Sequence, residues 1–96
     1  MSQIRLDLEG VEGVVRQIDA AIEELRTAAS HIDSQMESQL GAYWEGAAYQ
    51  KTMNTYEESY RRMLTKDLPE MVTNLSEYMT GCKEAIAETD RMLSGR

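Results

Sequence analysis

Two side chains in this 96-residue sequence could bind a metal or act as a nucleophile or base: Cys82 and His31, each the only residue of its type. Metal binding needs three or four convergent ligands, and the sequence has no Cys/His cluster. A Ser-His-Asp site needs its members to converge on a pocket, which two long packed helices do not offer. We therefore predict no catalytic, cofactor-binding or metal site, and we interpret the protein as a non-enzyme.

The surroundings of these two residues in the sequence favour structural roles. Cys82 falls on an apolar stripe between Tyr78 and Ile86, as a small buried hydrophobic residue would. An intermolecular disulfide in a dimer is the alternative. His31 stands beside Ile32 at the edge of a second stripe, which is typical of a boundary residue. The 17 acidic side chains are spread over the predicted outer faces and suit solubility.

Composition and charge exclude several classes of protein. The formal net charge is −7, so a nucleic acid or an anionic membrane surface is not expected as a partner. One Pro, six Gly and no Phe argue against a β-sandwich or barrel. The opening MSQIRLDLEG lacks the apolar stretch of a signal peptide, and no run is apolar enough for a membrane span. These features alone predict a cytoplasmic location.

The elements that position these side chains begin with one long amphipathic helix. Apolar residues recur in steps of four and three, which predicts a helix over about residues 8–40. Asp7 is the expected N-cap, and Gly41 is the expected residue after the helix end. The stripe consists of Ile4, Leu8, Val11, Val15, Ile18, Ile22, Leu25, Ala29, Ile32, Met36 and Leu40.

A second stripe predicts another helix over about residues 47–93. Its phase slips between Tyr60 and Met71, and Pro69 lies in the same region, so we expect a kink near residues 65–69. Glu57–Arg61 and Glu58–Arg62 are expected to pair on the outer face. The stripe consists of Tyr49, Met53, Tyr56, Tyr60, Leu64, Leu68, Met71, Leu75, Tyr78, Cys82, Ile86 and Leu93.

Two helices joined by a short turn at residues 41–46 predict one all-α domain over residues 1–96, an antiparallel helical hairpin. The apolar faces are too broad for one hairpin to cover. We therefore predict that two hairpins, either two copies or this chain and a similar protein, form a four-helix bundle. The expected packing and dimer residues are Val15, Ile18, Ile22, Leu25, Ile32, Tyr56, Tyr60, Leu64 and Leu75.

The turn contains the motif Trp44-Glu45-Gly46, with the only tryptophan of the chain. Gly46 allows a tight turn and a close approach of the second helix to a neighbouring backbone. Trp44 either packs under the turn as a purely structural residue or contributes to a surface shared with a partner. With its length of about 100 residues and a W-x-G between two helices, the chain resembles the WXG100 (ESAT-6-like) family.

That resemblance implies a function in type VII (ESX or Ess) secretion. Members are made in the cytoplasm and exported as folded homodimers or heterodimers, without a cleaved signal peptide. In many of them the W-x-G turn lies near the C-terminal signal of the partner, and an FtsK/SpoIIIE-type ATPase recognises both. The resemblance implies this role for Trp44 and Gly46.

One part of the family pattern is missing. No tyrosine begins a Y-x-x-x-D/E signal, since Tyr78 is followed at that spacing by Cys82. The protein is then a Firmicutes-type member with a looser signal, the signal-less half of a heterodimer, or an adaptor for a larger LXG-type toxin. An unrelated structural hairpin is a further alternative. If the tail is a signal, its expected residues are Thr89, Asp90, Met92 and Leu93.

Overall fold

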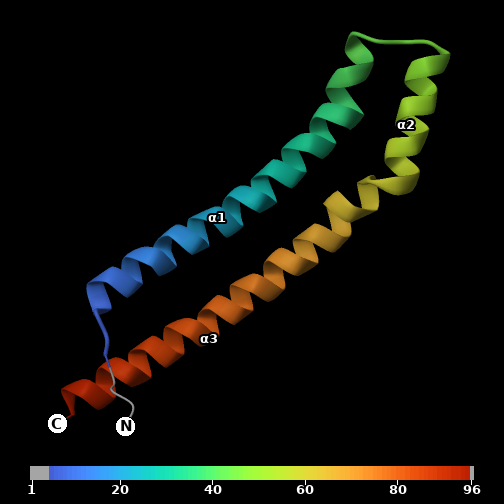
Figure 1. Cartoon of the computed structure of the whole chain (residues 1–96). Coiled ribbons are helices and arrows are strands. Elements are labelled where there is room, and N and C mark those ends of the chain that lie inside the picture. Colours follow the sequence, from blue (N-terminus) through green and yellow to red (C-terminus); the bar gives the residue numbers. More distant parts are fainter. Residues whose placement is uncertain (1–4, 96) are drawn as a thin grey trace.

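The computed structural model describes residues 5–95, and Ile4, the first residue of the predicted stripe, lies outside them. Two helical arms run antiparallel, and a turn joins them at one end of the molecule (Figure 1). About 90% of the chain is helical, and the described residues include no strand. The elements are α1 (Leu8–Ser34), η1 (Gln35–Gln39), η2 (Leu40–Ala42), α2 (Ala47–Ser59), η3 (Met63–Asp67) and α3 (Leu68–Ser94).

The first arm begins as expected and ends differently. The Asp7 side chain accepts a hydrogen bond from the Gly10 backbone N–H at 3.1 Å, which confirms the predicted N-cap. The α-helical geometry stops at Ser34, although the apolar stripe continues. The chain then forms the π-helix η1 and the 3-10 turn η2. The arm therefore reaches residue 42, but residues 35–40 do not form the α-helix that we expected.

The second arm is divided into two α-helices. α2 ends at Ser59, Tyr60 leaves helical geometry with φ −121° and ψ −31°, and the π-helix η3 follows before α3. Pro69 lies in the first turn of α3, where a missing N–H costs little. The irregular stretch thus covers residues 60–67, so it begins five residues before the expected kink and overlaps it at residues 65–67. Figure 1 shows α2 turned out of the line of α3.

The hairpin is too thin to enclose a large core. Its principal extents are 71 × 20 × 19 Å, and its radius of gyration is 21.0 Å. A compact domain of this length has a radius of gyration of about 13 Å. Ile22, Val72 and Met79 form the buried cluster between α1 and α3, with Val15, Leu68 and Cys82 packed against it. The buried hydrophobic residues are Ile22, Ala29, Met53, Tyr56, Val72 and Met79.

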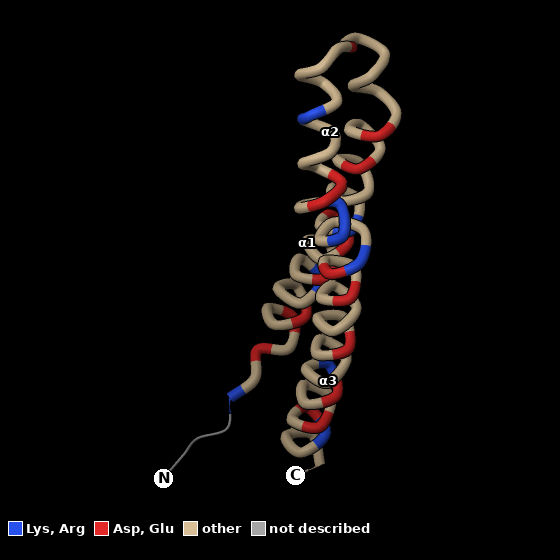
Figure 2. Tube along the Cα trace, turned by 90° about the vertical axis from the view of Figure 1, so that its right-hand side faces the viewer, with Lys and Arg blue, Asp and Glu red and all other residues tan. Residues whose placement is uncertain are grey.

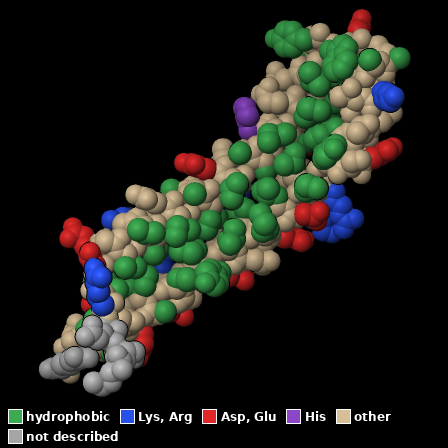
Figure 3. All heavy atoms as spheres, viewed as in Figure 1, with side chains coloured by type: hydrophobic (Ala, Val, Ile, Leu, Met, Phe, Trp, Pro, Cys, Tyr) green, Lys and Arg blue, Asp and Glu red, His purple; other side chains and the backbone are tan. Residues whose placement is uncertain are grey.

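One side of the hairpin is a continuous apolar surface, which we call the apolar face. On it, hydrophobic side chains cover the seam between the two arms along much of their length (Figure 3). We define the face by exposed residues that are three, four or seven positions apart and therefore share one side of each helix. They are Val14, Ile18, Leu25 and Ile32 of α1, and Met71, Leu75 and Tyr78 of α3.

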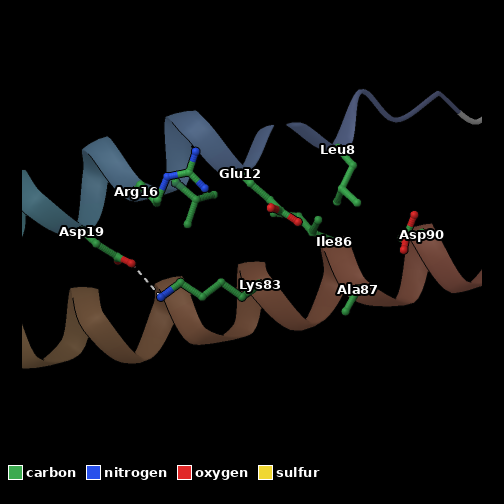
Figure 4. A pocket seen from close by; sticks show the side chains of 9 residues that line it. Leu8, Glu12, Arg16, Asp19, Lys83, Ile86, Ala87 and Asp90 are labelled. Carbon is green, nitrogen blue, oxygen red and sulfur yellow. Dashed lines mark ion pairs between the residues drawn. The ribbon is translucent and has the colours of Figure 1, made fainter. Parts of the chain in front are cut away.

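The opposite side of the hairpin, which we call the reverse face, carries an ion pair between the two arms. Asp19 lies about 100° around α1 from Ile18, and its Oδ2 is 2.6 Å from the Lys83 Nζ of α3. Figure 4 shows this ion pair beside a groove of about 410 Å³ at the open end of the hairpin. Asp and Glu occur along both arms of the trace (Figure 2). The Asp19–Lys83 ion pair therefore joins the two arms near their open end.

Candidate functional site

The turn between the arms depends on Gly46. Its φ is 118° and its ψ is −176°, and it is the only residue among 5–95 with a positive φ. That backbone conformation is accessible almost exclusively to glycine. A Cβ at Gly46 would have no atom within 4 Å. The glycine is therefore required by the dihedral angles, and within the described part of this chain no other backbone lies close to it.

Gly41 contributes space at the same turn. Its φ is not positive, so it does not end α1 in the left-handed conformation expected of it. A Cβ at Gly41 would lie 2.6 Å from the Tyr49 Oη and 3.3 Å from its Cζ. Tyr49, in the first turn of α2, thus packs directly against the end of the first arm. This contact joins the two arms across the turn.

Trp44 is half exposed at the apex of the hairpin. Its ring centroid lies 5.7 Å from that of Tyr49, with an angle of 59° between the ring planes, as in a tilted aromatic pair. The exposed fraction is 39% for Trp44 and 89% for its neighbour Tyr43. The apex therefore has an anchored tryptophan with one accessible side and a freely accessible tyrosine.

The predicted packing residues divide into three groups. Ile22 and Tyr56 are buried within the hairpin. Val15 packs against the buried cluster, and Leu64 is half buried. The others are exposed: Ile18, Leu25, Ile32, Tyr60 and Leu75. Each apolar stripe, although regular in sequence, thus contains some residues that contact the other arm and some that are exposed.

The residues suggested for a C-terminal signal lie in the last turns of α3. Thr89, Asp90 and Leu93 are half buried, and Met92 is exposed. The Thr89 hydroxyl donates a hydrogen bond to the Ala85 carbonyl at 2.9 Å. Asp90 lines the groove at the open end, opposite Leu8 (Figure 4). The structure therefore places this segment at the far end of the hairpin from Trp44.

A polar cluster joins the two arms below the turn. The Tyr56 hydroxyl donates a hydrogen bond to the Asp33 Oδ1 at 2.6 Å. The Arg61 Nε lies 3.2 Å from the same oxygen and 3.3 Å from the Glu37 Oε1. Burial, followed by the hydrogen bond to Asp33, raises the pKa of Tyr56 to about 12. The hydrogen bond to Asp33 and the charge of Glu37 raise the pKa of Arg61.

Sequence reasoning missed this cluster. Arg61 was expected to pair with Glu57, and Arg62 with Glu58. Among residues 5–95, neither pair lies within ion-pair distance, and Arg61 reaches across to the first arm instead. The helix break at Tyr60 redirects Arg61, and nothing in the i,i+4 spacing reveals that break. The available signal was Asp33, a charge placed between the apolar positions Ala29 and Met36.

Among the residues that the structure describes, neither Cys82 nor His31 lies beside side chains that would make it reactive. Cys82 is half buried against Ile22, Val72 and Met79. His31 is exposed on α1. Within residues 5–95, no three side chains of the metal-binding types gather in one place. No helix of the described chain combines the length and apolarity that crossing a bilayer requires.

The fold and the turn together define a class, the helical hairpins of about 100 residues with W-x-G between their arms. A family described as "Proteins of 100 residues with WXG" matches residues 3–91, and the chain belongs to this family, WXG100. WXG100 proteins are non-enzymatic helical proteins secreted in type VII systems, and they typically pair with themselves or with other WXG proteins. No curated protein and no solved structure matched the chain.

Proposed function

We propose that this protein pairs through its apolar face and leaves the cell as a folded dimer through a type VII secretion system. Trp44 and Gly46 would form the turn presented to an FtsK/SpoIIIE-type ATPase, together with the tail residues Thr89, Asp90, Met92 and Leu93. Export would proceed without a cleaved signal peptide. The observation that carries the proposal is a long apolar face on a hairpin of a secreted family.

The dimensions of the apolar face support pairing. A second hairpin lying along half of the 71 Å axis, over the 20 Å width, would cover roughly 700 Å² of each partner. Specific interfaces bury about 800 Å² per partner, so even this partial overlap comes close to a standard interface. The contact would replace water over Leu25 and Leu75, whose exposed fractions are 43% and 38%. Apolar burial gives about 25 cal/mol per Å² before the costs of association.

The export role of Trp44 is tested by Trp44→Ala in a cell with a type VII system. Trp44 lies at the surface of the apex and is absent from the buried cluster, so we expect the variant to remain helical and paired. Export should fall about tenfold, the loss expected for removal of one aromatic anchor from an interface. Gln50→Ala, an exposed change near the same turn, is the matched control.

The measurement is the ratio of exported to cellular protein on immunoblots, with circular dichroism of both purified variants. Normal export of a helical Trp44→Ala protein would show that the tryptophan is structural only. Loss of export in both variants would point to a general defect of the turn and would equally contradict the specific role.

An adaptor for a larger LXG-type toxin is the second candidate. The absence of any Y-x-x-x-D/E favours it, because such a protein would depend on the signal of its partner. Co-expression with the product of the neighbouring gene discriminates between the two. Solubility that requires a long helical partner supports the adaptor, whereas a stable homodimer in isolation supports the self-sufficient substrate.

A further inference from the structure

Backbone irregularities occur in both arms close to the polar cluster. η1 follows directly after α1, and η3 packs against α1. Arg61, two residues before η3, contacts Asp33 of α1 and Glu37 of η1. A π-helical turn carries one more residue than an α-helical turn, and such turns are frequent places where helices bend. The part of the hairpin beyond this level, residues 40–59, is called the tip here.

The tip has few other contacts that fix its direction. Its buried side chains are Met53 and Tyr56, whereas the cluster of Ile22, Val72 and Met79 lies between α1 and α3. α3 packs extensively against α1, but α2 diverges from the line of α3 (Figure 1). Regions with little apolar contact open at low free-energy cost. The direction of the tip therefore depends on whatever joins α2 to the first arm.

The polar cluster supplies that connection. Tyr56 of α2 donates its hydrogen bond to Asp33, while Arg61 bridges Asp33 and Glu37. The Asp33 and Glu37 side chains are only 19% and 24% exposed, so solvent screens this cluster less than it screens an ordinary surface pair. Four side chains, from α1, η1, α2 and the stretch between α2 and η3, thus meet at the level where both backbones are irregular.

Arg61 has a special position in the cluster because one guanidinium faces two carboxylates. Asp33 and Glu37 are four residues apart, and like charges at this spacing on a helical arm repel one another. Glu37 Oε1 is buried without a hydrogen-bond partner among the described residues, so its charge depends on nearby Arg61. Removal of Arg61 would change an attractive cluster into a repulsive one.

From this geometry we infer that Arg61 is the latch of a hinge between the tip and the rest of the hairpin. With Arg61 in place, the tip holds one direction, and Trp44 keeps a fixed position relative to the apolar face. Without it, Asp33 and Glu37 repel, α2 separates from the first arm, and the apex becomes mobile. This conformational role of the cluster does not depend on the export function proposed above.

Hydrogen exchange followed by mass spectrometry on the full chain tests the latch. Arg61→Met should speed exchange in residues 47–59 about tenfold, because the tip loses its main connection, and should leave residues 72–79 unchanged. Arg62→Met is the matched control, since the neighbouring arginine has no ion pair among the described residues. Equal exchange of the tip in the two variants would overturn the inference.

A rescue variant separates the latch from a simple packing defect. Adding Glu37→Gln to Arg61→Met removes the repulsion, so exchange in the tip should return toward the wild-type rate; unchanged fast exchange would contradict the mechanism.

Should Arg61→Met fail to fold, Tyr56→Phe tests the same connection without a change of charge. It should speed exchange of the tip about threefold relative to Tyr60→Phe, as loss of one hydrogen bond allows; no difference overturns the inference.

Discussion

Gly46 shows how one backbone position decides whether the turn can form. An L-residue at φ 118° and ψ −176° is strained by about 1–3 kcal/mol. Gly46→Ala should therefore lower the free energy of unfolding by that amount, although the space for the methyl group is free. Urea unfolding, followed by circular dichroism at one fixed protein concentration, measures the change.

Gly81 provides the matched control because it lies inside α3, where an added methyl group would have no atom within 4 Å. Gly81→Ala should raise the free energy of unfolding by about 0.5–1 kcal/mol, as expected in a helix interior. The two substitutions add the same methyl group, so opposite changes in the free energy of unfolding would show the effect of the backbone dihedral angles at Gly46. A stabilising Gly46→Ala would disprove the positive φ at the turn.

Tyr56 makes stability depend on pH at the alkaline end. Its pKa is about 12 in the folded protein against 10.0 for an unperturbed tyrosine, so the folded state holds this proton more tightly. The stabilisation is complete below pH 10 and is lost as the pH rises through about 12. Tyrosinate absorbance of the wild type minus that of Tyr56→Phe should titrate near pH 12, and near pH 10 in urea. A difference titrating near pH 10 in the folded protein would contradict the buried hydrogen bond.

At the scale of the elements, the sequence predicted the two helical arms and a kink in the second, but not the π-helix in the first arm or the start of the second break at Tyr60. The stripe from Leu8 to Leu40 follows from one repeated contact along a helix, and such repetition is visible in sequence. The π-helices η1 and η3 depend on how the two arms fit together near Arg61 and Asp33. Pro69 led us to expect the kink at residues 65–69, but it lies in the first turn of α3, where proline is tolerated.

At the turn, too, some features could be predicted from the sequence and others depend on contacts between the arms. Trp44 and Gly46 could be selected from the sequence because tryptophan is unique in the chain and glycine is the residue for unusual dihedral angles. The contact of Tyr49 with Gly41 could not, since it joins the ends of two arms across the turn. Likewise, periodicity placed Ile22 and Leu25 on one stripe but did not show that only Ile22 faces the other arm.

For the whole molecule, the proposed pairing predicts a clear response to charge on the apolar face. Leu25→Glu would bury a carboxylate in the interface, so dimer affinity should fall about 100-fold. Thr27→Glu adds the same charge at an exposed position on the polar side of α1 and should leave the affinity unchanged. Sedimentation velocity should show twice 10.9 kDa for wild type and control, and 10.9 kDa for Leu25→Glu.

A monomeric wild-type protein, or a Leu25→Glu protein that stays paired, would contradict pairing through this face. Circular dichroism of the variant checks that the helices persist, so that dissociation is not mistaken for unfolding. Sedimentation of Leu25→Glu and Thr27→Glu mixed at equal concentration compares the association of the two variants under the same conditions.

The difference between the apolar face and the reverse face has a consequence for the size of the proposed assembly. A hairpin with adhesive surfaces on both sides could add copies without end and grow into a fibre. Here the reverse face carries the Asp19–Lys83 ion pair, which a third copy would have to cover and strip of water. If two copies associate through the apolar face as proposed, this single contact covers the exposed apolar residues of both, and growth is expected to stop at two.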